Sequence, residues 1–86
     1  MDIRPYVGKK VFAVWQDGNV LYEVEGTLKE AQMNGERECD SLVFGDARLE
    51  ISGDNGNIGA KYEDLSRLTM DSAGLVSIME ESLSKK

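Results

Sequence analysis

The chain of 86 residues contains no histidine, one cysteine (Cys39) and one proline (Pro5). A zinc site needs several histidine or cysteine ligands, so this composition argues against one. Without histidine, the usual base that activates a serine or cysteine nucleophile is missing, and an enzyme is the least supported functional class. A single cysteine cannot form an intrachain disulfide, which favours a reducing, cytoplasmic location.

Long apolar runs are also missing from the chain. No segment is apolar for long enough to span a bilayer, and the N-terminal residues do not resemble a signal peptide, so we expect no membrane association. The 16 acidic residues outnumber the 10 basic ones, and the net charge of −6 opposes non-specific attraction to phosphate backbones or anionic lipids. The hydrophobic fraction of 41% is high enough for a folded domain, and the length predicts a single domain over residues 1–86.

The segment Gly53–Gly59 is glycine-rich but fits neither of the ligand-binding loops that it suggests. It leads into a predicted strand and lacks the lysine of a phosphate-binding loop. If Gly56 is aligned with the loop glycine of a calcium-binding EF-hand, Tyr62 falls where a bidentate glutamate is needed. We therefore expect neither a metal ion nor a cofactor.

The strongest structural signal in the chain is a hairpin within residues 11–28. Asp17-Gly18 stands between two segments rich in β-forming residues, which is typical of a tight hairpin turn. Gly26 lies inside the second of these segments, where glycine usually marks a bend or a close approach of two backbones. Alternating apolar residues between turn residues predict five strands, over residues 11–16, 20–31, 41–44, 48–52 and 58–62.

The last part of the chain, residues 71–86, has the pattern of an amphipathic helix. Asp71 or Ser72 is suited to cap its start. The apolar residues that recur at helical spacing are Leu75, Val76, Ile78, Met79 and Leu83. We expect this helix to pack against the β-sheet domain or against a neighbouring subunit.

Short motifs in the β-rich region resemble those of the Sm-like family. The pattern Val11-x-Ala13-x-Trp15-x-Asp17-Gly18 with Gly26-x-Leu28 resembles the first Sm-like motif, and Met33-Asn34 resembles the loop that ends it. Ile51-Ser52-Gly53-Asp54-Asn55 resembles the second motif, although a serine stands where the family has a base-stacking arginine. The resemblance spans residues 11–62, and the hairpin is longer than the family usually has.

The resemblance implies a mainly β fold, a five-stranded, strongly bent antiparallel barrel over residues 7–63 that the C-terminal α-helix would follow. It also implies a homo-oligomeric ring, in which the fourth strand of one subunit pairs with the fifth strand of the next. Family members bind single-stranded RNA at the central pore through the loops of the two motifs. Carried over to this chain, the candidate RNA-binding residues are Gln32, Met33, Asn34, Ser52, Gly53 and Asp54.

Two functions stay open from the sequence. The first is a ring-forming Sm-like protein that binds single-stranded RNA or scaffolds an RNA–protein assembly. The charge opposes it, because residues 30–54 contain seven acidic and two basic residues, and because ordinary turns also select asparagine, aspartate and glycine. The second is an acidic, non-enzymatic protein-interaction module, or an inhibitor that imitates the charge of a nucleic acid.

Overall fold

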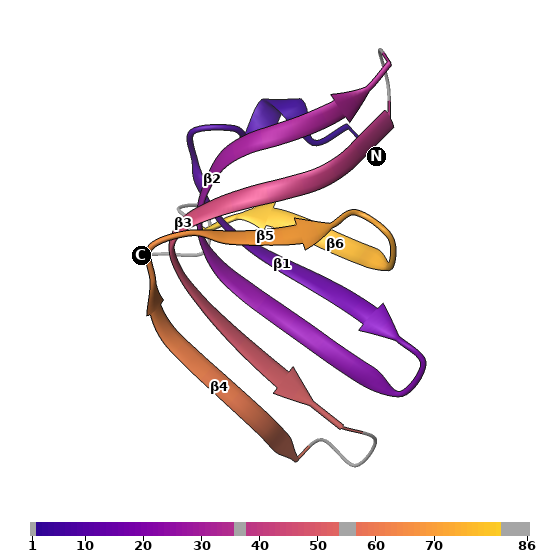
Figure 1. Cartoon of the computed structure of the whole chain (residues 1–86), viewed down its shortest axis with the longest axis vertical. Coiled ribbons are helices and arrows are strands. Elements are labelled where there is room, and N and C mark those ends of the chain that lie inside the picture. Colours follow the sequence, from indigo (N-terminus) through magenta and orange to yellow (C-terminus); the bar gives the residue numbers. More distant parts are fainter. Residues whose placement is uncertain (1, 36–37, 54–56, 82–86) are drawn as a thin grey trace.

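The computed structural model describes residues 2–35, 38–53 and 57–81, which form an antiparallel sheet of six strands after a short 3-10 helix (Figure 1). The mainly β class is therefore confirmed. No helix in the described part of the chain is long and apolar enough to cross a membrane. The elements are η1 (Arg4–Tyr6), β1 (Lys10–Asp17), β2 (Val20–Asn34), β3 (Glu38–Ser52), β4 (Ile58–Leu65), β5 (Leu68–Asp71) and β6 (Leu75–Glu80).

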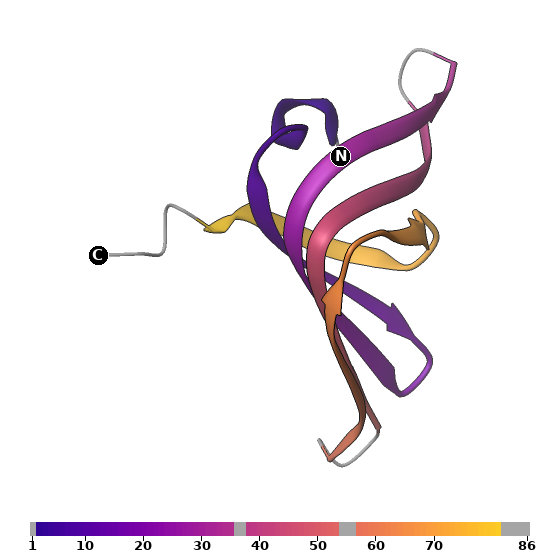
Figure 2. The same cartoon turned by 60° about the vertical axis from the view of Figure 1, so that its left-hand side comes forward.

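The order of strands across the sheet is β4-β3-β2-β1-β6, and β5 also pairs with β3. Different parts of the two long central strands, β2 and β3, pair with different neighbouring strands. β4 pairs with residues 47–52 of β3, whereas β5 pairs with residues 41–44, and β1 pairs with residues 20–27 of β2. The sheet therefore bends across its middle, and its two halves curve around a common interior (Figure 2).

The bend depends on glycines in both central strands. A Cβ atom on Gly26 would lie 2.9 Å from the Cα and Cβ atoms of Ala47, so the backbones approach too closely there for any larger residue. This close approach confirms the interpretation of Gly26. Opposite it, the chain passes Gly45 and then Asp46, whose φ is 51°, and the pairing register of β2 with β3 shifts at this point. Such a bulge bends a strand without ending its ladder.

This bulge explains why the predicted third and fourth strands were wrong as separate elements. Residues 41–44 and 48–52 both belong to β3, which continues through the turn residues between them. Glycine followed by aspartate is typical of a turn, and the local pattern does not reveal that the partner strand follows the same bend.

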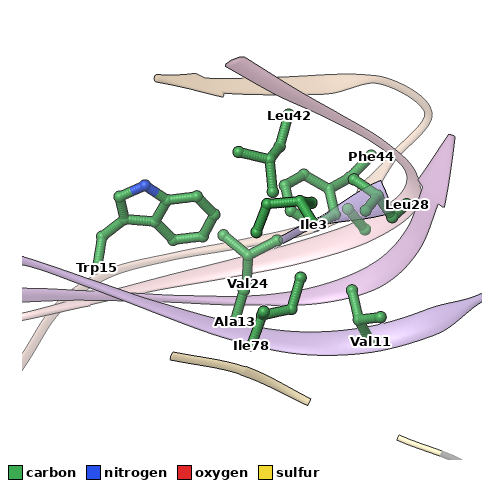
Figure 3. Close-up of a cluster of buried hydrophobic side chains, with 10 residues drawn as sticks. Ile3, Val11, Ala13, Trp15, Val24, Leu28, Leu42, Phe44 and Ile78 are labelled. Atoms are coloured by element: carbon green, nitrogen blue, oxygen red, sulfur yellow. The ribbon is translucent and has the colours of Figure 1, made fainter. Parts of the chain in front are cut away.

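One cluster of apolar side chains fills the interior of the bent sheet (Figure 3). Val11, Ala13 and Trp15 alternate along β1 and are all buried, so this face of the strand points into the core. The rings of Trp15 and Phe44 meet edge to face, with 6.0 Å between centroids. No polar or charged residue is buried within the described ranges. The cluster comprises Ile3, Val11, Ala13, Trp15, Val24, Leu28, Leu42, Phe44, Ala47 and Ile78.

The predicted C-terminal helix is wrong for the described part of residues 71–86. Leu75–Glu80 form strand β6, which pairs with β1 so that Ile78 lies opposite Ala13, and residues 82–86 lie outside the described ranges. The side chain of Ile78 is buried while that of Met79 is 53% exposed, which is the alternation of a strand. β1 is apolar on both faces, and without β6 one of its edges would have no ladder partner. Pairing with this edge stabilises the strand more than the helical spacing of the apolar residues favours a helix.

Candidate functional site

The two segments predicted to bind RNA lie at opposite ends of the β2–β3 ladder (Figure 1). Asn34 ends β2 and pairs with Glu38, whereas Ser52 ends β3 and pairs with Leu21 near the start of β2. Gln32 and Met33 accompany Asn34, and Gly53 follows Ser52. A single subunit therefore does not bring the two groups together, and Asp54 lies outside the described residues.

The contacts of these residues serve the ends of the hairpin. The Ser41 hydroxyl donates a hydrogen bond to the Gln32 side-chain oxygen at 2.9 Å, and Met33 lies opposite Cys39 in the ladder. Burial raises the pKa of the Cys39 thiol, and the partly buried side chain packs against the core as a small apolar residue does. At the other end, the Gly53 amide donates to the Asn57 carbonyl oxygen at 3.0 Å and closes the turn.

A pocket of about 340 Å³ opens beside Trp15, at the end of the core. We call it the Trp15 pocket. One wall comes from the β1–β2 hairpin, where the short turn places Trp15 opposite Tyr22, and the other comes from the end of β5 and the turn into β6. Its lining consists of Trp15, Gln16, Asp17, Tyr22, Met70, Asp71, Ala73 and Gly74.

Hydrogen bonds to the backbone hold the two walls of the Trp15 pocket together. The Trp15 indole N–H donates to the Asp71 carbonyl oxygen at 2.7 Å, and the Gln16 amide donates to the Gly74 carbonyl oxygen at 2.9 Å. Gly74 has φ of 85°, and a Cβ atom there would lie 2.9 Å from the Gln16 carbonyl oxygen. The turn before β6 therefore needs glycine both for its conformation and for the close contact with β1.

The chemistry of the Trp15 pocket combines apolar walls with negative charge. Asp17 and Asp71 are its two ionisable carboxylates, and no lysine or arginine lines it. Neither carboxylate belongs to an ion pair within the described ranges, although Asp71 Oδ1 accepts a hydrogen bond from the Ala73 amide at 3.3 Å. Nowhere in the described ranges do three or more acidic or cysteine side chains gather as metal ligands would.

Apolar side chains continue from the pocket across the concave face of the sheet. Ladder pairing places a row of residues on five neighbouring strands, which we call the apolar row, and Tyr62 at its β4 end is 50% exposed. In the described part of the chain, β4 pairs only with β3 and β6 pairs only with β1, so both ends of the row reach an open edge. The apolar row consists of Ile78, Ala13, Val24, Leu49 and Tyr62.

The opposite, convex face carries charged residues that are largely paired with one another. Arg48 forms an ion pair with Glu25, and Lys61 lies 3.7 Å from Glu50. The pKa of Glu25 is lowered by a hydrogen bond with the Glu81 side chain and, after that, by Arg48. Because Arg48 and Lys61 already have carboxylate partners, neither of these two bases offers the free positive charge that phosphate binding needs.

The sequence gives little sign of the Trp15 pocket, because the polar residues at the start of residues 71–86 suit a helix cap equally well. The register of the hairpin was a usable signal, since a tight turn after Asp17 places Trp15 beside Tyr22. The wall from Met70 to Gly74 gave no such signal, because its position depends on the pairing of β6 with β1.

Comparison of the chain with protein-family models, with curated proteins and with solved structures finds no match. Its function has to be inferred from the residues and geometry described above.

Proposed function

We propose that this chain is a non-enzymatic, Sm-like subunit that assembles with copies of itself into a ring and serves as a protein scaffold. The observation that carries the proposal is the apolar row, which ends at an open strand edge on both sides of the sheet. The antiparallel pairing and the two long, bent central strands also support it, although the six strands form an open sheet where the Sm-like motifs imply a five-stranded barrel.

Pairing of β6 in one copy with β4 in the next copy would give both open edges a partner. It would satisfy backbone groups that an edge strand leaves without a ladder partner and would extend the apolar row from one subunit into the next. The edges carry exposed apolar side chains that such pairing can cover, because Tyr62 is 50% exposed and Val76 and Met79 are each 53% exposed.

The edges available for assembly differ from those expected from the sequence. Residues 48–52, the predicted fourth strand, lie between β2 and β4 and are paired on both sides. Residues 58–62 belong to β4, which is an edge strand. We therefore propose contact between β4 and β6 in place of contact between the predicted fourth and fifth strands.

A protein scaffold fits the geometry better than RNA binding does. The predicted RNA contacts lie at opposite ends of the β2–β3 ladder, the Trp15 pocket is acidic, and the net charge is −6. All of these features disfavour a phosphate backbone. RNA binding is therefore the alternative function, and a separate experiment below tests it.

Light scattering of the purified protein tests the assembly. We expect the wild type to have a mass several times the 9.5 kDa of one chain. The double variant Tyr62→Lys/Val76→Lys should be a monomer, because lysine on an edge strand opposes strand addition. Val7→Lys is the matched control, since Val7 is 41% exposed but lies outside the strands. A wild type that stays monomeric at high concentration would overturn the proposal.

Mobility-shift assays with uridine-rich and adenine-rich oligonucleotides at low salt test the RNA alternative. We expect no shift. A shift that disappears with Asn34→Ala would instead favour the RNA-binding function that the motifs imply.

A further inference from the structure

The Trp15 pocket has the composition of a site for a positively charged side chain. We propose that it binds a lysine or arginine side chain from a basic partner protein. This proposal is independent of assembly, because no residue of the pocket lining belongs to β4, and the pairing of β6 through Val76 and Met79 does not involve the pocket.

Charge selects a cation as the ligand. Asp17 and Asp71 both line the pocket, and no basic residue belongs to its lining. The net charge of −6 adds a long-range attraction for a basic partner. A phosphate group would be repelled, and a metal ion would find fewer ligands than it needs, since no cluster of three candidate ligands exists within the described ranges.

The apolar lining of the pocket favours a ligand whose charged group is attached to an apolar chain. Tyr22 and Met70 are partly buried, Trp15 is 3% exposed, and all three belong to the lining. Lysine and arginine stems pack along such surfaces while their charged ends remain near water or carboxylates, and an aromatic ring attracts the charged end as well. The volume of about 340 Å³ accommodates one long side chain.

The pocket is formed before any ligand arrives. The indole bond to Asp71 and the amide bond from Gln16 to Gly74 join its two walls. A site held in this way loses little conformational freedom on binding, so a modest set of contacts is enough for specific recognition.

The experiment uses the fluorescence of Trp15, the one tryptophan of the chain, together with the NMR signals of its indole N–H and of the Gly74 amide. The probes are capped peptides Gly-Lys-Gly and Gly-Arg-Gly, and the neutral control is Gly-norleucine-Gly. We expect saturable changes with the basic peptides and an affinity about ten-fold lower for the norleucine peptide, from loss of the ion pair and of the cation–ring attraction.

Variants locate the interaction. Asp17→Asn and Asp71→Asn each remove one charge from the pocket, and asparagine at position 71 keeps an oxygen for the Ala73 amide; each should weaken peptide binding by about two- to five-fold. Glu30→Gln is the matched control, because Glu30 is exposed in the half of β2 beyond β1, and it should leave affinity unchanged.

Three results would overturn the proposal. They are equal binding of the norleucine peptide, an equal loss with Glu30→Gln, and changes at Trp15 caused by an oligonucleotide in place of a basic peptide. The Tyr62→Lys/Val76→Lys variant should bind the basic peptides like the wild type, so failure of the pocket proposal and failure of the assembly proposal give different results.

Discussion

At the scale of single residues, glycines constrain this fold for different physical reasons. Gly26 is needed for space, since Ala47 approaches its backbone directly, whereas Gly74 is needed both for a left-handed conformation and for the contact with Gln16. Gly53 has neither constraint, because a Cβ atom there would meet nothing within 4 Å. The three positions therefore provide an internal comparison.

Replacement of Gly26 by alanine should lower the free energy of unfolding by about 2 kcal/mol, because the new methyl group must displace the backbone of β3. The matched change Gly53→Ala should alter it by less than about 0.5 kcal/mol. Urea denaturation at neutral pH measures both values. Equal effects would mean that β2 and β3 do not approach closely at the bend.

Glu25 links stability to pH. Its pKa lies below the ordinary value of 4.5 because of the Glu81 hydrogen bond and then of Arg48, so folding favours the ionised form. The resulting stabilisation is present above the unfolded pKa and is lost as the pH falls through the folded pKa. We expect the Glu25→Gln variant to lose less stability than the wild type between about pH 5 and pH 3.

Chemical denaturation at a series of pH values measures this difference. Glu30→Gln serves as the control, because Glu30 is exposed and outside the Glu25–Arg48 pair. A wild-type slope that Glu25→Gln leaves unchanged would show that the Glu25 contacts do not contribute to acid sensitivity.

At the scale of elements, β6 shows how a strand can form against its local pattern. Its apolar residues have a spacing that also suits a helix, and in a helix Ile78 and Met79 would share one face. In the structure Ile78 enters the core and Met79 points to solvent, because the edge of β1 supplies ladder partners for β6. The left-handed Gly74 starts this return to β1.

Alanine substitutions at these two neighbours distinguish a strand from a helix. Ile78→Ala should cost about 2 kcal/mol or more of unfolding free energy, since it empties space in the core. Met79→Ala should cost less than about 0.5 kcal/mol, since the side chain is exposed. Thermal and urea unfolding provide the values, and similar losses at the two positions would indicate the helical arrangement instead.

At the scale of the whole molecule, size and open edges are connected. A domain of this length buries a smaller share of its surface than a larger one does, and its sheet ends in β4 and β6 without further partners in the described chain. Assembly between these edges would add burial that a single copy cannot provide.

If assembly stabilises the fold, the thermal midpoint should rise with protein concentration, because association favours the folded state by mass action. We expect a clear rise for the wild type over a hundred-fold range of concentration and none for Tyr62→Lys/Val76→Lys. Calorimetry or circular dichroism at several concentrations measures it. A wild-type thermal midpoint that is independent of protein concentration would show that assembly does not stabilise the fold.

The sequence by itself determined the features that depend on neighbouring residues. The Asp17-Gly18 turn and the bend at Gly26 follow from local turn chemistry and from the absence of a side chain, and both were predicted. Candidate site residues were proposed from short motifs, and the structure shows only that their two groups lie at separate ends of one ladder.

Only the tertiary structure decided the continuity of β3, the conversion of the predicted helix into β6 and the formation of the Trp15 pocket. Each depends on strands that are distant in the sequence, as in the pairing of Ala13 with Ile78. Local spacing is compatible with more than one element in such segments, and the backbone of a distant partner selects among them because an open edge and an uncovered core cost more than a weak local preference gains.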